Sequence, residues 1–168
     1  MTATDAATDA AILPPSIDPK TKKIGIRKVT AVNEGGTRTV ARVRHFEPVA
    51  ADEPDSLGGT NTAPSPLEMA LVSLASCDGV IIHGVAKAMN FAYSRVEFEV
   101  EGQIDVRGPK GVPGIRRYFE TVGLKIRVTT PESEERFQKL QANVEYRCPV
   151  MNLFRDAGVT MNVVWEKV

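Results

Sequence analysis

One segment, Ser65 to Asn90, constrains the fold of this chain more than any other. Ser65 suits an N-cap, Pro66 suits the first helical position, and Glu68 completes a capping box with Ser65. The helix predicted to begin there can run to about Asn90. Its first half, as far as Cys77, is apolar on almost every side. Such a helix is typical of the interior of a protein, so we expect a long buried helix at the centre of the fold.

Strand-like runs lie on both sides of this segment. Two precede it, over residues 23–32 and 38–46, and Asn33 to Gly36 between them has the composition of a hairpin turn. Residues 48–65, rich in proline and glycine, predict a long loop. Later, alternating apolar residues and a proline after Cys148 predict further elements. These are strands over 95–105 and 119–129, helices over 131–146 and 149–156, and a strand over 159–166. The expected fold class is therefore α+β, with mostly antiparallel sheets around the long central helix.

Length and charge limit the organisation and the partners. The chain has 168 residues and 42% apolar content, which fits one ordinary domain. We expect residues 1–20 to form a mobile extension and residues 21–168 to form a single domain. The 21 basic and 21 acidic residues cancel to a net charge of zero. This argues against nucleic acid or an anionic membrane as a partner recognised by electrostatics.

The cellular compartment determines whether the two cysteines are expected to be oxidised or reduced. Residues 1–11 lack the basic and apolar regions of a signal peptide. The longest nearly uncharged apolar window, Met69 to Cys77, is shorter than the ~20 residues that a membrane span needs. We therefore expect a cytoplasmic protein, in which Cys77 and Cys148 do not form a permanent structural disulfide. Both are then reduced, and either inert or reactive.

Local sequence gives the two cysteines different expectations. Cys77 lies inside the apolar helix, where the simplest interpretation is a small buried hydrophobic side chain. Asp78 follows it directly, and a neighbouring carboxylate disfavours a thiolate. Cys148 stands at the N-cap of the short helix begun by Pro149, beside Arg147, and both features lower the pKa of a thiol. Local physics alone would therefore make Cys148 the thiolate. The two histidines show no ligand pair at metal spacing, so no metal or other cofactor is expected.

Four motifs resemble the OsmC/Ohr family, the osmotically inducible and organic-hydroperoxide-resistance proteins. They are Leu57-Gly58-Gly59, Pro64-Ser65-Pro66-Leu67-Glu68, Leu74-Ala75-Ser76-Cys77 and Arg147-Cys148-Pro149-Val150. The resemblance covers residues 36–166, over which the expected order of strands and helices also agrees. It implies an OsmC-like intertwined homodimer with active sites at the subunit boundary. It also implies a thiol peroxidase cycle that uses no haem, metal or selenium.

The resemblance further implies a set of four catalytic residues. Cys77 matches the peroxidatic cysteine and Cys148 the resolving cysteine. Glu68 corresponds to an active-site glutamate that pairs with an arginine, although the capping box already explains a glutamate at this position. The arginine comes from the N-terminal strands, where Arg38 matches best by position. Two further arginines, Arg42 and Arg44, are expected on the same strand face.

The expected function is thus the reduction of organic hydroperoxides by a cysteine-based peroxidase. Its expected partners are the hydroperoxide, a dithiol reductant and a second copy of the chain. Two alternatives remain open at this point. One is a non-catalytic member of the same fold that binds a small apolar ligand. The other is a redox sensor whose cysteines report oxidation without efficient turnover.

Overall fold

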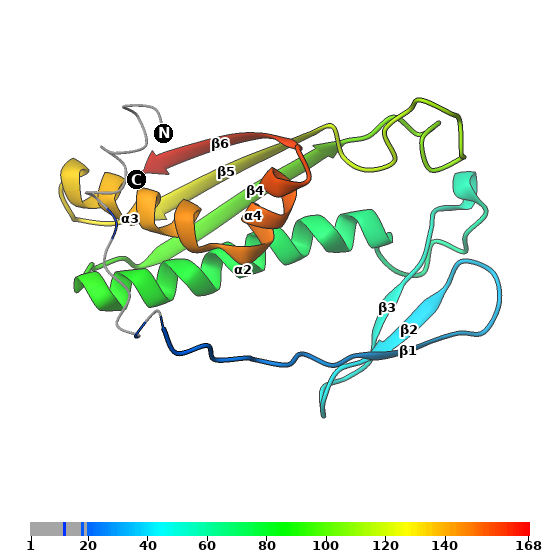
Figure 1. Cartoon of the computed structure of the whole chain (residues 1–168), viewed down its shortest axis with the longest axis horizontal. Helices are drawn as coiled ribbons and strands as arrows, with labels where there is room; N and C mark the ends of the chain where they lie inside the picture. The colour runs from blue at the N-terminus through cyan, green and yellow to red at the C-terminus, as the bar shows by residue number, and fades with distance from the viewer. Residues whose placement is uncertain (1–11, 13–17, 19) are drawn as a thin grey trace. The chain divides into compact units, whose positions relative to one another are not determined.

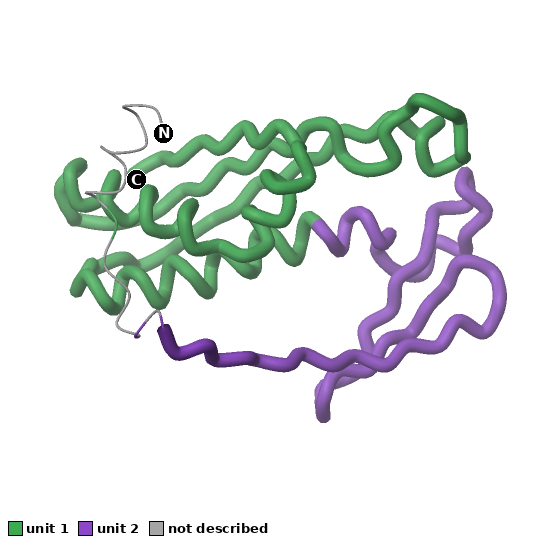
Figure 2. Tube along the Cα trace, in the orientation of Figure 1, with its two compact units in different colours: residues 1–14, 71–168 green, residues 15–70 purple. Residues whose placement is uncertain are grey.

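The computed structural model describes residues 12, 18 and 20–168. The expected mobile extension over residues 1–20 therefore lies almost entirely outside the described residues. The chain divides into two compact units (Figure 2). One unit is Pro15–Ala70, and the other contains Leu71–Val168.

The larger unit is built on a three-stranded sheet of order β4-β5-β6 (Figure 1). Strand β4 is Arg95–Gln103, β5 is Thr121–Thr129 and β6 is Thr160–Lys167. Strands β4 and β5 pair antiparallel, whereas β5 and β6 pair parallel. A parallel pair needs a long crossover connection, which here contains two helices. They are α3, Glu134–Arg147, and α4, Pro149–Asp156.

The core lies on one face of this sheet. Alternate residues of β5 point to that face and are almost fully buried: Val122, Leu124, Ile126 and Val128. The other face is charged, and Arg127 binds Glu99 at 2.7 Å and Glu166 at 2.9 Å there. The helices cover the apolar face, since Phe137 of α3 meets the Trp165 ring with centroids 6.1 Å apart. The unit is therefore a two-layer α/β sandwich.

The helix boundaries agree closely with the local capping signals. Helix α4 covers the predicted residues because Pro149 occupies its first turn. Helix α3 begins three residues later than the expected start at Pro131, because Ser133 is its N-cap. The Ser133 hydroxyl accepts a hydrogen bond from the backbone N–H of Arg136 at 3.3 Å. A serine hydroxyl at this position satisfies one of the free N–H groups of the first turn.

The long helix α2, Pro66–Met89, is buried along one side only within the single chain. Its buried residues recur at helical spacing: Leu74, Asp78, Ile82, Val85 and Ala86. A Cβ on Gly79 would lie 3.7 Å from the Phe98 ring, so the helix packs directly against β4. Other apolar side chains of α2 are exposed, with Val80 70% and Val72 56% accessible. Burial on every side, as the sequence predicts, would require a further covering surface.

Length and composition alone would allow α2 to cross a membrane, and it is the one such helix among the described residues. An 18-residue window has a mean hydropathy of 1.7, which corrects the shorter apolar stretch taken from the sequence. Its buried side holds the carboxyl group of Asp78 against other helices of the unit. Core helices of globular proteins satisfy the same criteria of length and composition. We interpret α2 as such a core helix.

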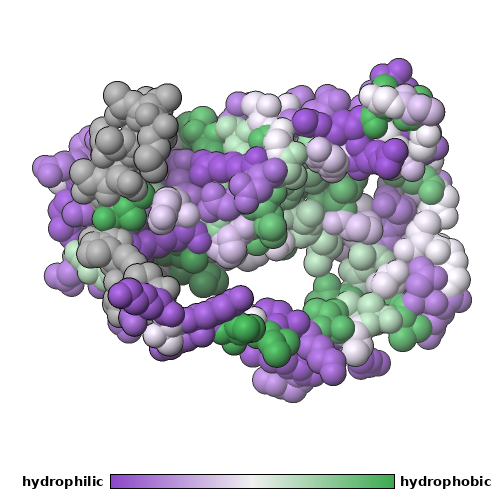
Figure 3. Space-filling model, viewed as in Figure 1, coloured by the Kyte–Doolittle hydropathy of each residue, from purple (hydrophilic) through white to green (hydrophobic). Residues whose placement is uncertain are grey.

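The smaller unit carries a second sheet of order β1-β2-β3, antiparallel throughout. Its strands are Thr30–Asn33, Thr39–Arg42 and Val49–Ala51, followed by the short 3-10 helix η1, Asp55–Leu57. The first two strands are shorter than the predicted runs 23–32 and 38–46. The predicted loop 48–65 contains both β3 and η1. Hydrophobic side chains appear on the surface among hydrophilic ones (Figure 3).

Asp52 is the only buried residue among the described residues of this smaller unit. Its carboxylate accepts hydrogen bonds from the hydroxyls of Thr37 at 2.6 Å and Thr60 at 2.6 Å. Thr62 donates both its N–H and its hydroxyl, and Glu53 donates its N–H. These bonds, led by that from the Thr37 hydroxyl, hold the pKa of Asp52 far below its usual range. The centre of this unit is therefore polar and not apolar.

Candidate active site

The two cysteines are 71 positions apart in the sequence, and the larger unit brings their thiols together. Cys77 lies on α2, one position from the buried stripe, and is half-buried. Cys148 lies between α3 and α4 and is 0% exposed. Both are free thiols, and their side chains interact. One accessible thiol thus stands beside one enclosed thiol.

Cys148 caps α4 with its sulfur. The backbone N–H of Met151 donates to Sγ at 3.4 Å, which is the N-cap contact expected from Pro149. The pKa of Cys148 is nevertheless raised well above its ordinary value, chiefly by burial and then by its contact with Asp78. The Met151 N–H opposes this increase but is the weaker effect. The sequence expectation of a lowered pKa at Cys148 is therefore wrong, because removal from water outweighs the helix terminus.

Asp78 is the third group of the cluster, and its side chain is 0% exposed. Neither of its oxygens completes a hydrogen bond with any described residue. The Cys148 thiol is still near enough for the two groups to affect each other, as expected of a loosely aligned S–H···O contact. Burial raises the pKa of Asp78 to about 6 despite the opposing effect of that thiol. A buried carboxyl group with a raised pKa therefore lies beside both cysteines.

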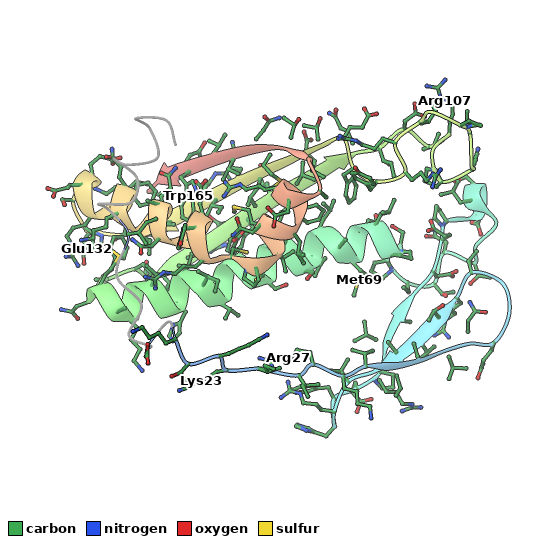
Figure 4. All side chains as sticks on the ribbon, in the orientation of Figure 1. Lys23, Arg27, Met69, Arg107, Glu132 and Trp165 are labelled. Carbon is green, nitrogen blue, oxygen red and sulfur yellow. The ribbon has the colours of Figure 1, made fainter. Side chains whose placement is uncertain are left out.

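An ion pair on the neighbouring helices faces this cluster. Glu145 of α3 binds Arg155 of α4 at 2.6 Å. Trp165, labelled in Figure 4, donates its indole N–H to Glu145 Oε1 at 3.1 Å. Glu145 raises the pKa of Asp78 and Arg155 lowers it. Because the two charges neutralise each other, burial remains the main influence on Asp78.

Glu68 lies at the start of α2, within the smaller unit. Its Oε2 accepts hydrogen bonds from the backbone N–H of Ser65 at 2.7 Å and from the Ser65 hydroxyl at 2.8 Å. The N–H of Glu68 donates to the same hydroxyl at 3.3 Å. These bonds lower the pKa of Glu68. The predicted capping box is present, and Oε1 has no hydrogen-bond partner among the described residues.

The three candidate arginines of the smaller unit are all exposed. Arg38 precedes β2 and Arg42 ends it. Exposure and position therefore do not show which of the two is the better candidate for the site. Arg44 has a backbone φ of 52° and lies with its guanidinium carbon 4.5 Å from the centre of the Phe46 ring. It therefore does not share the strand face that the sequence alternation predicts for all three. Within this unit, no ion pair joins Glu68 to any of them.

Sequence reasoning treated Asp78 only as an unfavourable neighbour of Cys77. A signal for its burial was present, since Leu74, Asp78 and Ile82 are spaced four residues apart on one helix face. A polar residue within an apolar stripe points into the core. Among residues 12, 18 and 20–168, no three His, Cys, Asp or Glu side chains gather in a way that could hold a metal ion. A shallow surface groove on the charged face of the sheet includes neither cysteine in its lining.

A sequence model of the family described as OsmC-like protein matches residues 59–164, which include Glu68 and both cysteines. No curated protein sequence matches the chain significantly. Many solved structures do match.

Three of these structures illustrate the likeness. The OsmC-like protein from Mycoplasma pneumoniae is 23% identical, with 86% of this chain and 98% of that chain covered and a TM-score of 0.70. An organic hydroperoxide resistance protein OsmC from Legionella pneumophila is 20% identical, with 86% and 99% covered and a TM-score of 0.66. The organic hydroperoxide resistance protein OhrB of Bacillus subtilis is 21% identical, with 86% and 98% covered and a TM-score of 0.56. At these identities the likeness establishes a shared fold.

Proposed function

The chain belongs to the OsmC-like protein family, and on this premise we propose that it is a cysteine-based peroxidase that reduces organic hydroperoxides. One observation carries the proposal: a half-buried thiol, Cys77, interacts with a fully buried thiol, Cys148. That pair is what a peroxidatic and a resolving cysteine require. Two structural relatives whose names state organic hydroperoxide resistance lend further support.

The proposed cycle has three steps. The Cys77 thiol loses its proton, and the thiolate attacks the O–O bond of the hydroperoxide and becomes a sulfenic acid, while the leaving alkoxide takes up a proton and departs as the alcohol. Cys148 then attacks that sulfur, a disulfide forms, and water leaves. A dithiol reductant finally reopens the disulfide by exchange. Free thiols persist where the compartment is reducing, so we place this cycle in the cytoplasm.

Burial supports this assignment of roles. A hydroperoxide has to reach the attacking sulfur, and Cys77 is the more accessible of the two. Cys148 is enclosed, and its raised pKa keeps it protonated at neutral pH. An enclosed thiol is poorly placed to meet a substrate but well placed to meet its neighbour once that neighbour is oxidised. We therefore assign the first oxidation to Cys77 and the resolving attack to Cys148.

Glu68 and Arg38 complete the proposed site. The free Oε1 of Glu68 is available to bind a guanidinium while Oε2 holds the cap. Arg38 would supply the guanidinium that stabilises the Cys77 thiolate and orients the hydroperoxide. Capping and catalysis are then two uses of one carboxylate.

We also propose that the chain works as a homodimer. The described part of the smaller unit has no buried apolar residue of its own, and α2 leaves Val72 and Val80 exposed. A sheet without an apolar core is marginal in isolation, so it requires further apolar contacts. A second copy of the chain would supply them.

The function is tested by turnover and by thiol count. The reduced protein is mixed with dithiothreitol and an alkyl hydroperoxide, and the rate of peroxide consumption is measured. The same rate is then measured with hydrogen peroxide as the substrate. We expect consumption that prefers the organic peroxide, and loss of both free thiols per chain when dithiothreitol is omitted. Peroxide consumption no faster than with dithiothreitol alone would exclude the peroxidase.

A second candidate, the redox sensor, is favoured by one observation. The raised pKa of Cys148 slows its attack, so the oxidised state could outlast a catalytic cycle. A sensor would form the same disulfide once but would consume little peroxide beyond one equivalent per chain. Comparison of the first turnover with the steady-state rate separates these two functions.

A further inference from the structure

The peroxidase cycle leaves one group of the cluster without a role, the carboxyl group of Asp78. It follows Cys77 directly in α2, and its side chain is 0% exposed. Both oxygens lack a hydrogen-bond partner among the described residues. Burial of a carboxyl group without partners is unfavourable. A fold that keeps it beside two thiols therefore suggests a use for it there.

Because Cys148 is enclosed, its thiol needs a proton acceptor inside the protein. Its thiol has to lose a proton when the sulfur attacks, yet it is 0% exposed and solvent does not reach it. The sulfur accepts the N–H of Met151 at 3.4 Å, and a backbone N–H cannot accept a proton. Asp78 is the carboxylate in contact with this thiol. It is thus the base within reach.

We infer that Asp78 is a catalytic residue that carries the proton during disulfide formation, an inference that rests on the proposed peroxidase function. Its carboxylate takes the S–H proton of Cys148 as that sulfur attacks the sulfenic sulfur of Cys77. The electron pair of Cys148 forms the S–S bond, and the S–O bond of Cys77 breaks. The hydroxide that leaves takes the proton from Asp78 and becomes water. Both cysteines end as the disulfide, and Asp78 returns to its carboxylate form.

The charges around Asp78 suit this role. Glu145 on α3 and Arg155 on α4 face it and oppose each other, and the two thiols are its other titratable neighbours. The resulting pKa of about 6 leaves the carboxylate form dominant at neutral pH. A base with a pKa near the working pH both accepts and returns a proton efficiently.

The test follows the attack of Cys148 without any peroxide. One equivalent of dithiobis(nitrobenzoate) converts Cys77 into a mixed disulfide, and Cys148 then displaces a second thionitrobenzoate, whose absorbance gives the rate. We expect the rate to rise with pH through the titration of Asp78 and then to level off, because the carboxylate takes the proton. Asp78→Asn should slow this release by about ten-fold or more near neutral pH and abolish the plateau. Asp156→Asn, an exposed carboxylate at the end of α4, is the matched control and should leave both unchanged.

Release from Asp78→Asn that is as fast as, or faster than, release from the native protein would overturn the inference. The carboxylate would then only disfavour ionisation of Cys148. If the variant does not fold, the native pH profile decides, since a rate that keeps rising well above neutral pH also overturns it. If the native protein consumes no hydroperoxide but still shows this dependence on Asp78, the peroxidase proposal fails and the proton role stands.

Discussion

Ser65 donates two hydrogen bonds to a single oxygen of Glu68, from its backbone N–H at 2.7 Å and from its hydroxyl at 2.8 Å. The other oxygen of the same carboxylate has no partner among the described residues. The carboxylate therefore has one structural side and one unused side. Variants of Ser65 and Glu68 distinguish the capping role of this carboxylate from its proposed catalytic role.

Glu68→Gln is expected to keep most of the cap, because glutamine also fits a capping box. The free energy of unfolding should fall by about 1 kcal/mol or less. If Glu68 also orients the proposed catalytic arginine, peroxide turnover should fall by about ten-fold, because that arginine loses its partner charge. Urea unfolding and steady-state kinetics measure the two effects.

Ser65→Ala is the matched control for this variant. It removes the hydroxyl from the cap, at a cost of about 1 kcal/mol, but leaves the Glu68 charge in place. Its turnover should stay near that of the native protein. Unchanged turnover in Glu68→Gln would leave Glu68 as a cap alone.

The roles of the two thiols are separated by single serine variants. Cys77→Ser is expected to abolish peroxide consumption, because the accessible thiol makes the first attack. Cys148→Ser should still react once, and its Cys77 should then proceed to sulfinic and sulfonic acid with excess peroxide, since no resolving thiol remains. Intact-protein mass spectrometry detects the added oxygens. Retention of the first oxidation step in Cys77→Ser and its loss in Cys148→Ser would reverse the assignment.

Stability should depend on pH through Asp78. Its pKa is about 6 in the folded protein against 3.8 ordinarily, so the folded state holds the proton more tightly. Above about pH 6 the buried group is charged and destabilises the fold, whereas below about pH 4 it is protonated in both states. This pKa difference corresponds to about 3 kcal/mol, an upper figure for one group.

Asp78→Asn is therefore expected to be more stable than the native protein at about pH 7 and to lose that advantage towards about pH 4. Urea unfolding of both proteins across this range measures the difference. Asp156→Asn should follow the native curve. A native protein that is more stable than Asp78→Asn at neutral pH would show that the carboxylate has a stabilising partner in solution.

Assembly can be tested on α2. Sedimentation at micromolar concentration should give about twice the 18.3 kDa mass of the chain. Val80→Lys should weaken this dimer, because Val80 is an exposed apolar side chain of α2. Val164→Lys, on the charged face of the sheet, is the control and should keep the native mass. A stable folded monomer of the native chain would exclude the dimer.

Sequence predicted the fold best where single residues fix the backbone. Pro149 at the start of α4 and Ser65 at the start of α2 determine their helices locally, and both predictions were confirmed. The strand predicted over residues 23–32 was too long, because only Thr30–Asn33 finds a partner. Strand β3 was missed, since Val49–Ala51 is too short to show alternation. Pairing partners are long-range information that local pattern does not contain.

At the candidate site, sequence predicted the positions of residues in the helices better than it predicted their electrostatics. It placed Cys148 at a helix N-terminus correctly, but the net shift of the Cys148 pKa is upward because burial outweighs the helix terminus. Burial decides that sign, and burial depends on how α2, α3 and α4 pack together. The contact between Asp78 and Cys148 has the same origin. Neither the burial of Cys148 nor its contact with Asp78 can be inferred from the few residues that flank it in the sequence.

The parallel pairing of β5 with β6 also has a consequence during protein synthesis. Strand β5 leaves the ribosome long before β6, because α3 and α4 are made between them. Until β6 arrives, β5 is an edge strand with a hydrophobic face and unpaired backbone groups. Cys148 emerges in this same interval, before the layer that encloses it is complete. The nascent chain therefore exposes a thiol that the finished protein encloses.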